Sequence, residues 1–280
     1  MPKTPNKVKF GIKNAHYAVM TTGEDGSVTF GTPVAIPGSV NFTMDAQGET
    51  STFYADDMAY YVTATNAGYS GTFEVALVPD PFRVDVLKET LDPSAQVLVE
   101  HVDSQPATFA LLFEFNGDQH ATRHVLYNCT ATRASVSGST TTNTTEPTTE
   151  TLNLTASPLP SGVVRAKTTA KTPDAVYGAW YDAVWQPLSV LTVTSEAGSS
   201  SGKTAVTVAP AKASGNAYKY MTGASVTLPA YGAEPGAGYQ DWDGSEEITA
   251  TTGNQLAIVE VDSGGKAVAG GIATVTANGG

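Results

Sequence analysis

The sequence predicts an all-β fold with two short helices. Thr, Val, Tyr and Phe alternate with polar residues along most of the chain, and Gly or Pro interrupts this pattern about every 8–12 residues. Two segments break the period of two and carry the signals of a helix start. We therefore expect the strands to form a β-sandwich or barrel on which two helices pack.

Composition narrows the class of protein. The chain has 280 residues, of which 41% are hydrophobic, so it is not a disordered acidic polymer. With 27 acidic and 15 basic residues its net charge is −12, which argues against tight binding to nucleic acid phosphates. Its apolar runs fall far short of the ~20 residues that span a bilayer. Residues 1–7 are followed by no apolar segment, so we expect no membrane contact and no secretory signal peptide.

The chain opens with a basic segment and then a long excursion. Residues 1–13 hold four lysines and no acid, which predicts a short basic arm on an acidic protein. Alternating residues at 40–45 and 72–77 predict two strands. Residues 45–70, which join these strands, are rich in acids and tyrosines. Long loops of this kind commonly carry function.

A strong hairpin is expected at residues 107–133. Four apolar side chains alternate along its first strand: Phe109, Leu111, Phe113 and Phe115. Asn116 and Gly117 predict a tight turn. Uninterrupted alternation in the return strand places on one side Arg123, Val125, Tyr127, Cys129 and Ala131. We expect this pair to form the centre of the N-terminal domain, with Cys129 buried as a small apolar residue.

Two helices follow from local start signals. Asp80 before Pro81 suits a helix N-terminus, which predicts a helix over about residues 80–89. Pro173 and Asp174 repeat the signal, and an apolar stripe then predicts a helix over about 173–185. Both are too short to be stable alone, so each must pack on a sheet.

The chain divides near residue 190. Residues 1–190 form the larger predicted domain, and 191–280 read as a small Ig-like β-sandwich with its own strands and turns. A Ser/Gly-rich stretch at 198–202 lies at the start of the second part.

The motifs that could indicate catalysis or metal binding lack the surrounding structure or spacing that such sites require. Residues 198–202 match the Gly-x-Ser-x-Gly pattern of a nucleophile elbow, but no helix is predicted after them. Residues 241–246 resemble a calcium loop with its glycine in the wrong register. His120 and His124 would lie about 13 Å apart on a strand. We therefore expect no catalytic residue, no cofactor site and no metal site, and the protein is not predicted to be an enzyme.

Several segments, in this order, resemble the major tail tube proteins of long, non-contractile (siphovirus-type) bacteriophage tails. They are residues 9–18 (KFGIKNAHYA), 31–38 (GTPVAIPG), 53–57 (FYADD), 68–87 (GYSGTFEVALVPDPFRVDVL), 109–140 (with FALLFEF and ATRHVLYNCTATR) and 146–169 (with TASPLP). The resemblance covers about residues 7–187. Residues 191–280 resemble the C-terminal β-sandwich decoration module that some members of this family carry.

This resemblance implies a structural virion protein. Its copies would form hexameric rings that stack into a tube, with a tape-measure protein inside and a tail terminator and chaperones as further partners. Double-stranded DNA would pass through the tube without specific binding. The protein would be located in the virion tail, and in the host cytoplasm during assembly.

Charged residues supply candidates for two surfaces of such a tube. Asp45, Glu74 and Glu114 lie on the polar faces of strands and would face either an acidic lumen or the outer solvent. Contacts between rings would join the basic arm to the 45–70 loop through Lys3, Lys7, Lys9, Lys13, Asp56, Asp57, Tyr60 and Tyr61. Alternatively, these tyrosines cover the core of their own domain.

A second hypothesis belongs to a different class. Two tandem β-sandwiches could form a non-enzymatic surface-binding or adhesin-like protein. Aromatic residues in the Gly-rich loops of the second part, Tyr231, Tyr239 and Trp242, favour this alternative for 191–280. It predicts a protein that stays monomeric at all concentrations.

Overall fold

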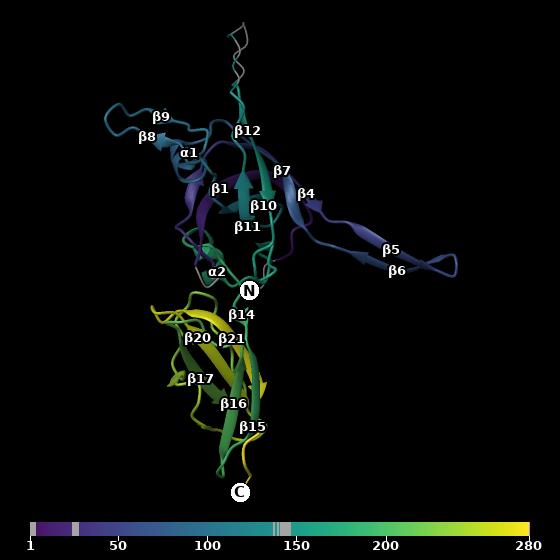
Figure 1. Ribbon diagram of the computed structural model, residues 1–280, viewed down its shortest axis with the longest axis vertical. Helices are drawn as coiled ribbons and strands as arrows, with labels where there is room; N and C mark the ends of the chain where they lie inside the picture. The colour runs from purple at the N-terminus through teal and green to yellow at the C-terminus, as the bar shows by residue number, and fades with distance from the viewer. Residues whose placement is uncertain (1–3, 24–27, 137, 139, 141–146, 280) are drawn as a thin grey trace. The chain divides into compact units, whose positions relative to one another are not determined.

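The computed structural model describes residues 4–23, 28–136, 138, 140 and 147–279. Within these residues the regular secondary structure is almost wholly β-strand, with two short α-helices and one 3-10 turn (Figure 1). This confirms the predicted all-β fold with two short helices. The chain forms two compact units, Met1–Val184 and Trp185–Gly280.

The first unit is built on a nine-stranded sheet. Its main path runs through β2 (Val28–Phe30), β1 (Lys9–Thr22), β10 (Phe109–Gly117), β11 (Thr122–Ala131), β12 (Glu150–Ala156), β7 (Gly68–Val75) and β4 (Ser39–Gln47). β3 (Val34–Ile36) pairs with β1, and β13 (Arg165–Lys167) pairs with β11. The sheet curls over itself, since the ring centroids of Phe42 on β4 and Phe113 on β10 lie 4.4 Å apart. In the described part no ladder joins β4 to β2, so the sheet does not close into a barrel.

Two short helical segments pack on this sheet. α1 (Asp80–Asp85) buries Phe82 against the rings of Tyr17 and Phe109. α2 (Asp174–Gly178) continues into the 3-10 turn η1 (Ala179–Tyr181), where Trp180 is buried. Both α-helices end earlier than the predicted 80–89 and 173–185. After α1 the backbone soon enters the left-handed region, at Lys88 (φ 63°), and cannot continue the helix.

The hairpin of β10 and β11 differs from the prediction in two ways. Asn116 and Gly117 belong to β10, and the connection runs from 118 to 121, so the tight turn predicted at these two residues is wrong. Gly117 is needed for a different reason: a Cβ there would lie 2.0 Å from the side-chain nitrogen of Asn6. A bulge at Asn128 (φ 44°) inserts one residue into β11, which brings Leu126 and Cys129 into the same core cluster.

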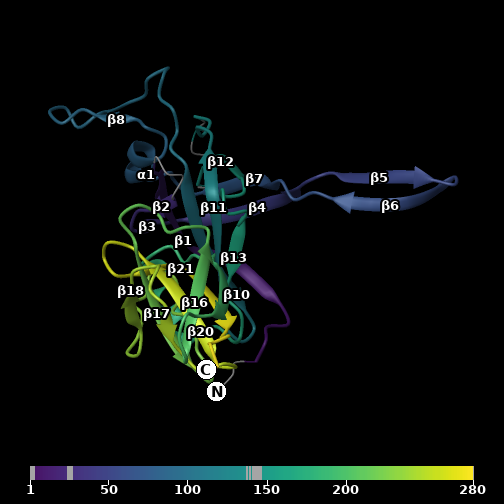
Figure 2. The same cartoon turned by 60° about the horizontal axis from the view of Figure 1, so that its bottom comes forward.

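The 45–70 excursion is a β-ribbon. β5 (Thr50–Ala55) and β6 (Met58–Ala64) pair with each other and continue the β4–β7 ladder through backbone bonds between Glu49 and Thr65 and between Gln47 and Ala67. Figure 2 shows the ribbon extending away from the sheet. A shorter ribbon, β8 (Thr90–Leu91) with β9 (Leu98–Val99), follows α1.

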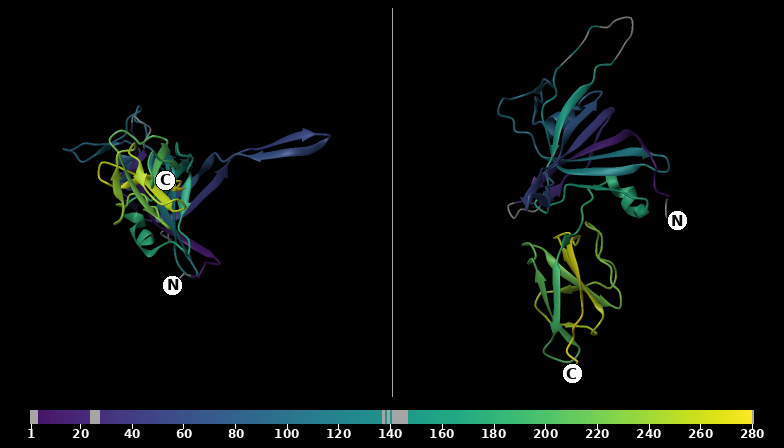
Figure 3. Two further views of the ribbon diagram at one scale, coloured as in Figure 1. Left: turned by 90° about the horizontal axis from the view of Figure 1, so that it is seen from below. Right: turned by 90° about the vertical axis from the view of Figure 1, so that its right-hand side faces the viewer.

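The second unit is a β-sandwich, seen from two further directions in Figure 3. One sheet has the order β14 (Ser189–Val190), β21 (Ala267–Thr274), β20 (Gln255–Val261), β17 (Ala217–Gly223) and β18 (Gln240–Trp242). The other consists of β15 (Thr192–Ala197), β16 (Lys203–Ala209) and β19 (Ile248–Thr249). Leu191, Trp242 and Ile258 belong to its core. Because β14 pairs with β21, this unit begins before residue 190.

Candidate functional site: an acidic hairpin and a basic pocket

The β5–β6 ribbon exposes an unusual amount of apolar surface. Six of its large side chains are between 55% and 72% exposed: Phe53, Tyr54, Met58, Tyr60, Tyr61 and Val62. Within the described residues its two strands pair only with each other, so both outer edges of the ribbon have free backbone groups. Free strand edges and clustered exposed aromatic residues are typical of surfaces that bind another chain.

The tip of the ribbon is acidic. Asp56 and Asp57 form the turn, with φ angles of 51° and 58°, and both are exposed. This left-handed region favours Gly or Asn at both positions of a two-residue turn. Two aspartates there place both carboxylates at the far end of the ribbon, between the exposed Tyr54 and Met58.

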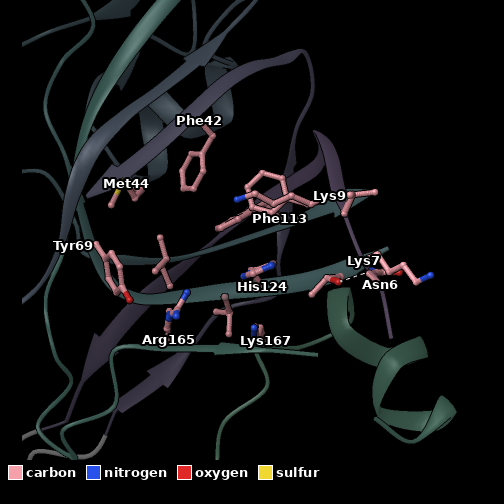
Figure 4. A pocket seen from close by; sticks show the side chains of 15 residues that line it. Asn6, Lys7, Lys9, Phe42, Met44, Tyr69, Phe113, His124, Arg165 and Lys167 are labelled. Carbon is pink, nitrogen blue, oxygen red and sulfur yellow. Dashed lines mark hydrogen bonds between the residues drawn. The ribbon is translucent and has the colours of Figure 1, made fainter. Parts of the chain in front are cut away.

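A pocket of about 490 Å³ opens on the curled sheet of the first unit (Figure 4). Its lining is aromatic and apolar on one side, with Phe42 and Met44 from β4, Tyr69 from β7 and Phe113 and Phe115 from β10. The charged side chains of the lining are basic. They are Lys7 and Lys9 from the N-terminal segment, and Arg165 and Lys167 from β13. In the described part of the chain no acidic residue lines this pocket, although the chain as a whole has a net charge of −12.

The basic groups of the pocket lie next to its aromatic rings. The Lys9 ammonium is 4.8 Å from the ring centroid of Phe115, and the Arg165 guanidinium is 5.3 Å from that of Tyr69. Cations over ring faces are stabilised by the ring quadrupole. The pocket can therefore accept a ligand that carries both negative charge and an apolar or aromatic body.

The N-terminal segment is held in place at this pocket. The Asn6 side chain donates to the carbonyl of His120 and accepts from the backbone N–H groups of Gln119 and His120. Asp118 accepts from the backbone N–H of Lys7, which holds the pKa of its carboxyl below the usual range. Residues 6–8 are thus fixed to the β10–β11 connection, and Lys9 and Lys13 lie within β1.

His124 lies among the rings of the pocket. It stacks on Phe113 with ring centroids 5.2 Å apart and an interplanar angle of 6°, and Phe115 meets it edge-on. Burial, and then the positive charges of Lys167, Arg165 and Lys9, lower the pKa of His124 to about 4. The imidazole is therefore neutral at pH 7.

This shift predicts a pH-dependent stability. Between the ordinary pKa of about 6.5 and the folded-state value of about 4, the unfolded chain binds a proton that the folded chain does not. The stability that comes from keeping His124 neutral is fully present above pH 6.5. As the pH falls toward 4, the free energy of unfolding drops by an amount on the order of 3 kcal/mol. Urea unfolding at several pH values should show His124→Phe losing less stability over this window than wild type.

The matched control for this experiment is His101→Gln, at an exposed histidine outside the pocket. We expect its pH profile to follow wild type. An equal loss of stability in wild type and in His124→Phe would contradict the role assigned to His124.

The predicted lumen residues do not form a cluster. Asp45 is exposed on β4, whereas Glu74 on β7 is half-buried and accepts from Thr149 Oγ1. Their register partners in the β4–β7 ladder, Ser70 and Asn41, place them four residues apart, or about 13 Å. Glu114 is only 3% exposed and lies in a cluster of the first unit.

The Glu114 cluster joins β1, β10 and β11 to the α2–η1 segment of the first unit. Its carboxylate lies 3.1 Å from Arg123 Nε and 3.5 Å from Lys13 Nζ, and it accepts from Asn14 Nδ2 at 2.7 Å. The Arg123 guanidinium lies over the rings of Tyr177 and Tyr181 and donates to the Tyr177 carbonyl. This cluster therefore fastens the α2–η1 segment to the sheet.

The structure separates the predicted contact residues into two groups. Lys7 and Lys9 line the pocket, and Asp56, Asp57, Tyr60 and Tyr61 lie on the ribbon; Lys13 pairs with Glu114, and Lys3 lies outside the described residues. The local sequence patterns did not identify Arg165, Lys167 and His124 as residues of one site. The alternation of Arg165 and Lys167 in an acidic chain was the available signal.

The segments considered for chemistry have other roles. Residues 198–202 join β15 and β16, two antiparallel strands, and so lack the helix that a nucleophile elbow requires. Cys129 is buried, which raises the pKa of its thiol to about 12. In the described part of the chain, His, Cys, Asp and Glu form no group of three or more placed to hold a metal ion. No helix in the described residues is long and apolar enough to cross a bilayer.

Comparison with known proteins gives a partial similarity. The family described as the S-layer protein SbsC C-terminal domain matches residues 196–278, or 83 of the 280 residues. No curated protein matches. The crystal structure of domains 7, 8 and 9 of the S-layer protein SbsC aligns over 96% of this chain and 72% of that chain, at 14% identity and a TM-score of 0.30. Values this low do not establish a shared fold.

The family match corrects the sequence-based prediction of function. The similarity found is to an S-layer protein, so the prediction of a major tail tube protein is wrong. The hexameric rings, tape-measure protein, tail terminator, chaperones, DNA passage, and location in a virion tail and host cytoplasm were implied only by that resemblance and are wrong with it. The lumen role of Asp45, Glu74 and Glu114 was suggested together with that resemblance and stays an untested prediction. The non-enzymatic surface-protein alternative agrees better with the match.

Proposed function

We propose that this chain is a non-enzymatic structural protein of the surface-layer type, whose copies associate through the β5–β6 ribbon. The observation that carries this proposal is the ribbon itself, which exposes six large apolar side chains and two free strand edges. Burying such a surface against another copy removes apolar area from water and satisfies backbone groups.

The family match supports a role at a cell surface. Residues 196–278 are similar to a domain of an S-layer protein, and these residues fall within the second unit. The ribbon belongs to the first unit. We therefore assign self-association to the first unit and leave the sandwich of the second unit as a separate module on the same chain.

The proposal predicts that assembly depends on the ribbon aromatics. The triple variant Tyr54→Ser, Tyr60→Ser, Tyr61→Ser should raise the concentration of half-assembly at least about a hundredfold, because each buried aromatic contributes about 1.5–3 kcal/mol. Light scattering over a concentration series, with negative-stain microscopy of the particles, measures this. The side chains are exposed in one copy, so the folded state should keep its stability.

The matched control changes another exposed ribbon. Leu91→Ser, Val97→Ser and Val99→Ser remove apolar surface from the β8–β9 region and should leave assembly unchanged. Equal assembly of wild type and the tyrosine variant would contradict the proposal. A wild-type protein that stays monomeric but sediments with cell envelopes would favour the surface-binding alternative instead.

A further inference from the structure

We propose that the basic pocket of the first unit is the receptor for the tip of the β5–β6 ribbon of a second copy. This inference rests on the proposed self-association and names the surface that the ribbon binds. It pairs the acidic tip at Asp56 and Asp57 with a pocket whose charged lining residues are all basic.

The charges of the two surfaces are complementary. The pocket gathers Lys7, Lys9, Arg165 and Lys167, four of the 15 basic residues of the chain, and none of the acidic residues that the structure describes lines it. A concave basic site attracts an acidic partner, whereas the net charge of −12 makes the remaining surfaces of two copies repel each other. The tip presents two adjacent exposed carboxylates at the end of a narrow ribbon.

The apolar parts also match. Tyr54 and Met58 flank the two aspartates and are about two-thirds exposed, at 67% and 66%. The pocket offers the half-buried Phe42, Met44 and Phe115 as its apolar wall. Its volume of about 490 Å³ is in the usual range for sites that enclose a ligand. Aromatic and methionine side chains can therefore enter while the carboxylates face the basic groups (Figure 4).

The tip cannot reach the pocket of its own chain. Met44 and Tyr69, which line the pocket, lie near the base of the ribbon, close to the Ala46–Tyr69 pair. Asp56 lies ten residues beyond Ala46, which corresponds to about 33 Å along an extended strand. Continuous pairing from Gln47 to Ala55 keeps the ribbon extended. A ribbon tip that enters the pocket must therefore belong to another copy.

This arrangement makes the contact heterologous, because a tip on one copy binds a pocket on the next. Such head-to-tail contacts repeat until the rotation closes or the assembly extends without limit. Each copy uses one tip and one pocket. A variant with a defective tip or a defective pocket therefore cannot extend an assembly made only of its own copies.

Reciprocal charge reversal tests the inference. The pocket variant is Arg165→Glu with Lys167→Glu, and the tip variant is Asp56→Lys with Asp57→Lys. Each alone should need at least about a tenfold higher concentration for half-assembly than wild type, because like charges then meet. A one-to-one mixture should assemble again, since the acidic tip of the pocket variant meets the unchanged basic pocket of the tip variant, and the two lysines introduced at the other tip meet the two glutamates introduced into the other pocket. The control Lys88→Glu with Lys171→Glu makes the same charge change at exposed lysines outside the pocket and should behave as wild type.

The outcomes separate this inference from the proposed function. Normal assembly of wild type and of the pocket variant would overturn the inference while the ribbon's role in assembly stands. Failure of the mixture to assemble, with both variants as stable as wild type in urea unfolding, would also overturn it. A wild-type protein that never assembles would overturn the proposed function and this inference together.

Discussion

Replacing Arg123 with methionine should lower the free energy of unfolding of the first unit by about 3–5 kcal/mol. Arg123 forms an ion pair with Glu114, whose carboxylate is buried at 3% exposure. Without the guanidinium, the Glu114 carboxylate still has the Lys13 ammonium, at 3.5 Å, and the Asn14 amide as partners. The same change removes the cation from the rings of Tyr177 and Tyr181. Urea unfolding measures the loss of stability, and limited proteolysis near 173–184 reports release of the α2–η1 segment.

Arg133→Met is the matched control for this prediction. Arg133 pairs with Glu100 at the surface, where both side chains are exposed, so its loss should have little effect. The double variant Arg123→Met, Glu114→Met should recover much of the stability, because it removes the buried charge together with its partner. A similar cost for Arg123→Met and Arg133→Met would show that the buried cluster has no special role.

Phe82→Ala should destabilise the first unit by a comparable amount, about 3–5 kcal/mol. Phe82 is 1% exposed, and its ring meets those of Tyr17 and Phe109 edge-on, with centroids 5.1 and 5.5 Å away. Truncation leaves a cavity under α1, a six-residue helix that is stable only through its packing. Chemical unfolding followed by circular dichroism measures the effect.

Two further substitutions calibrate the Phe82 result. Phe82→Leu keeps most of the buried volume and should cost less than alanine. Phe10→Ala removes the same kind of side chain from a position on β1 that is 58% exposed, and should change stability by less than about 0.5 kcal/mol. If alanine at 82 cost no more than alanine at 10, α1 would not be held by this contact.

Local sequence patterns predicted the strands and helices better than they predicted which of these elements pack or pair with each other. Period-two alternation and turn residues were enough for the all-β class, and Pro81 and Pro173 located both helix starts to within a residue or two. Helix length was overestimated because the apolar pattern continues past α1 into residues such as Val86 and Leu87, which are buried outside the helix. Burial alone does not distinguish a helix from a packed loop.

The bulge in β11 shows where alternation fails. Period-two alternation assumes that every residue advances the strand by one position, but at Asn128 the strand holds an extra residue that has no register partner on β10. Cys129 therefore shares the core with Leu126 rather than with Val125. Asn tolerates a positive φ, but among the described Asn residues only Asn14 and Asn128 adopt one, so its presence alone did not mark the bulge.

The pocket could not be predicted because its parts are distant in the sequence. It combines residues 6–9, 42–44, 69, 113–126 and 165–167 through the curl of one sheet. Strand order and curl depend on pairings between segments more than a hundred residues apart, such as Lys9 with Gly117, and local pattern does not contain them. The acidic, tyrosine-rich ribbon, by contrast, lies within one segment, so composition alone identified it.

The parallel pairing of β14 with β21 has a mechanical consequence. These are the first and last strands of the second unit, joined at Ser189–Ala269 and Val190–Gly270 and by the bond from Leu191 N–H to the Gly270 carbonyl. Tension applied between the two ends of that unit pulls these strands in opposite directions along their length. The bonds are then loaded in shear and must break together rather than unzip one at a time, so the sandwich resists traction along its chain.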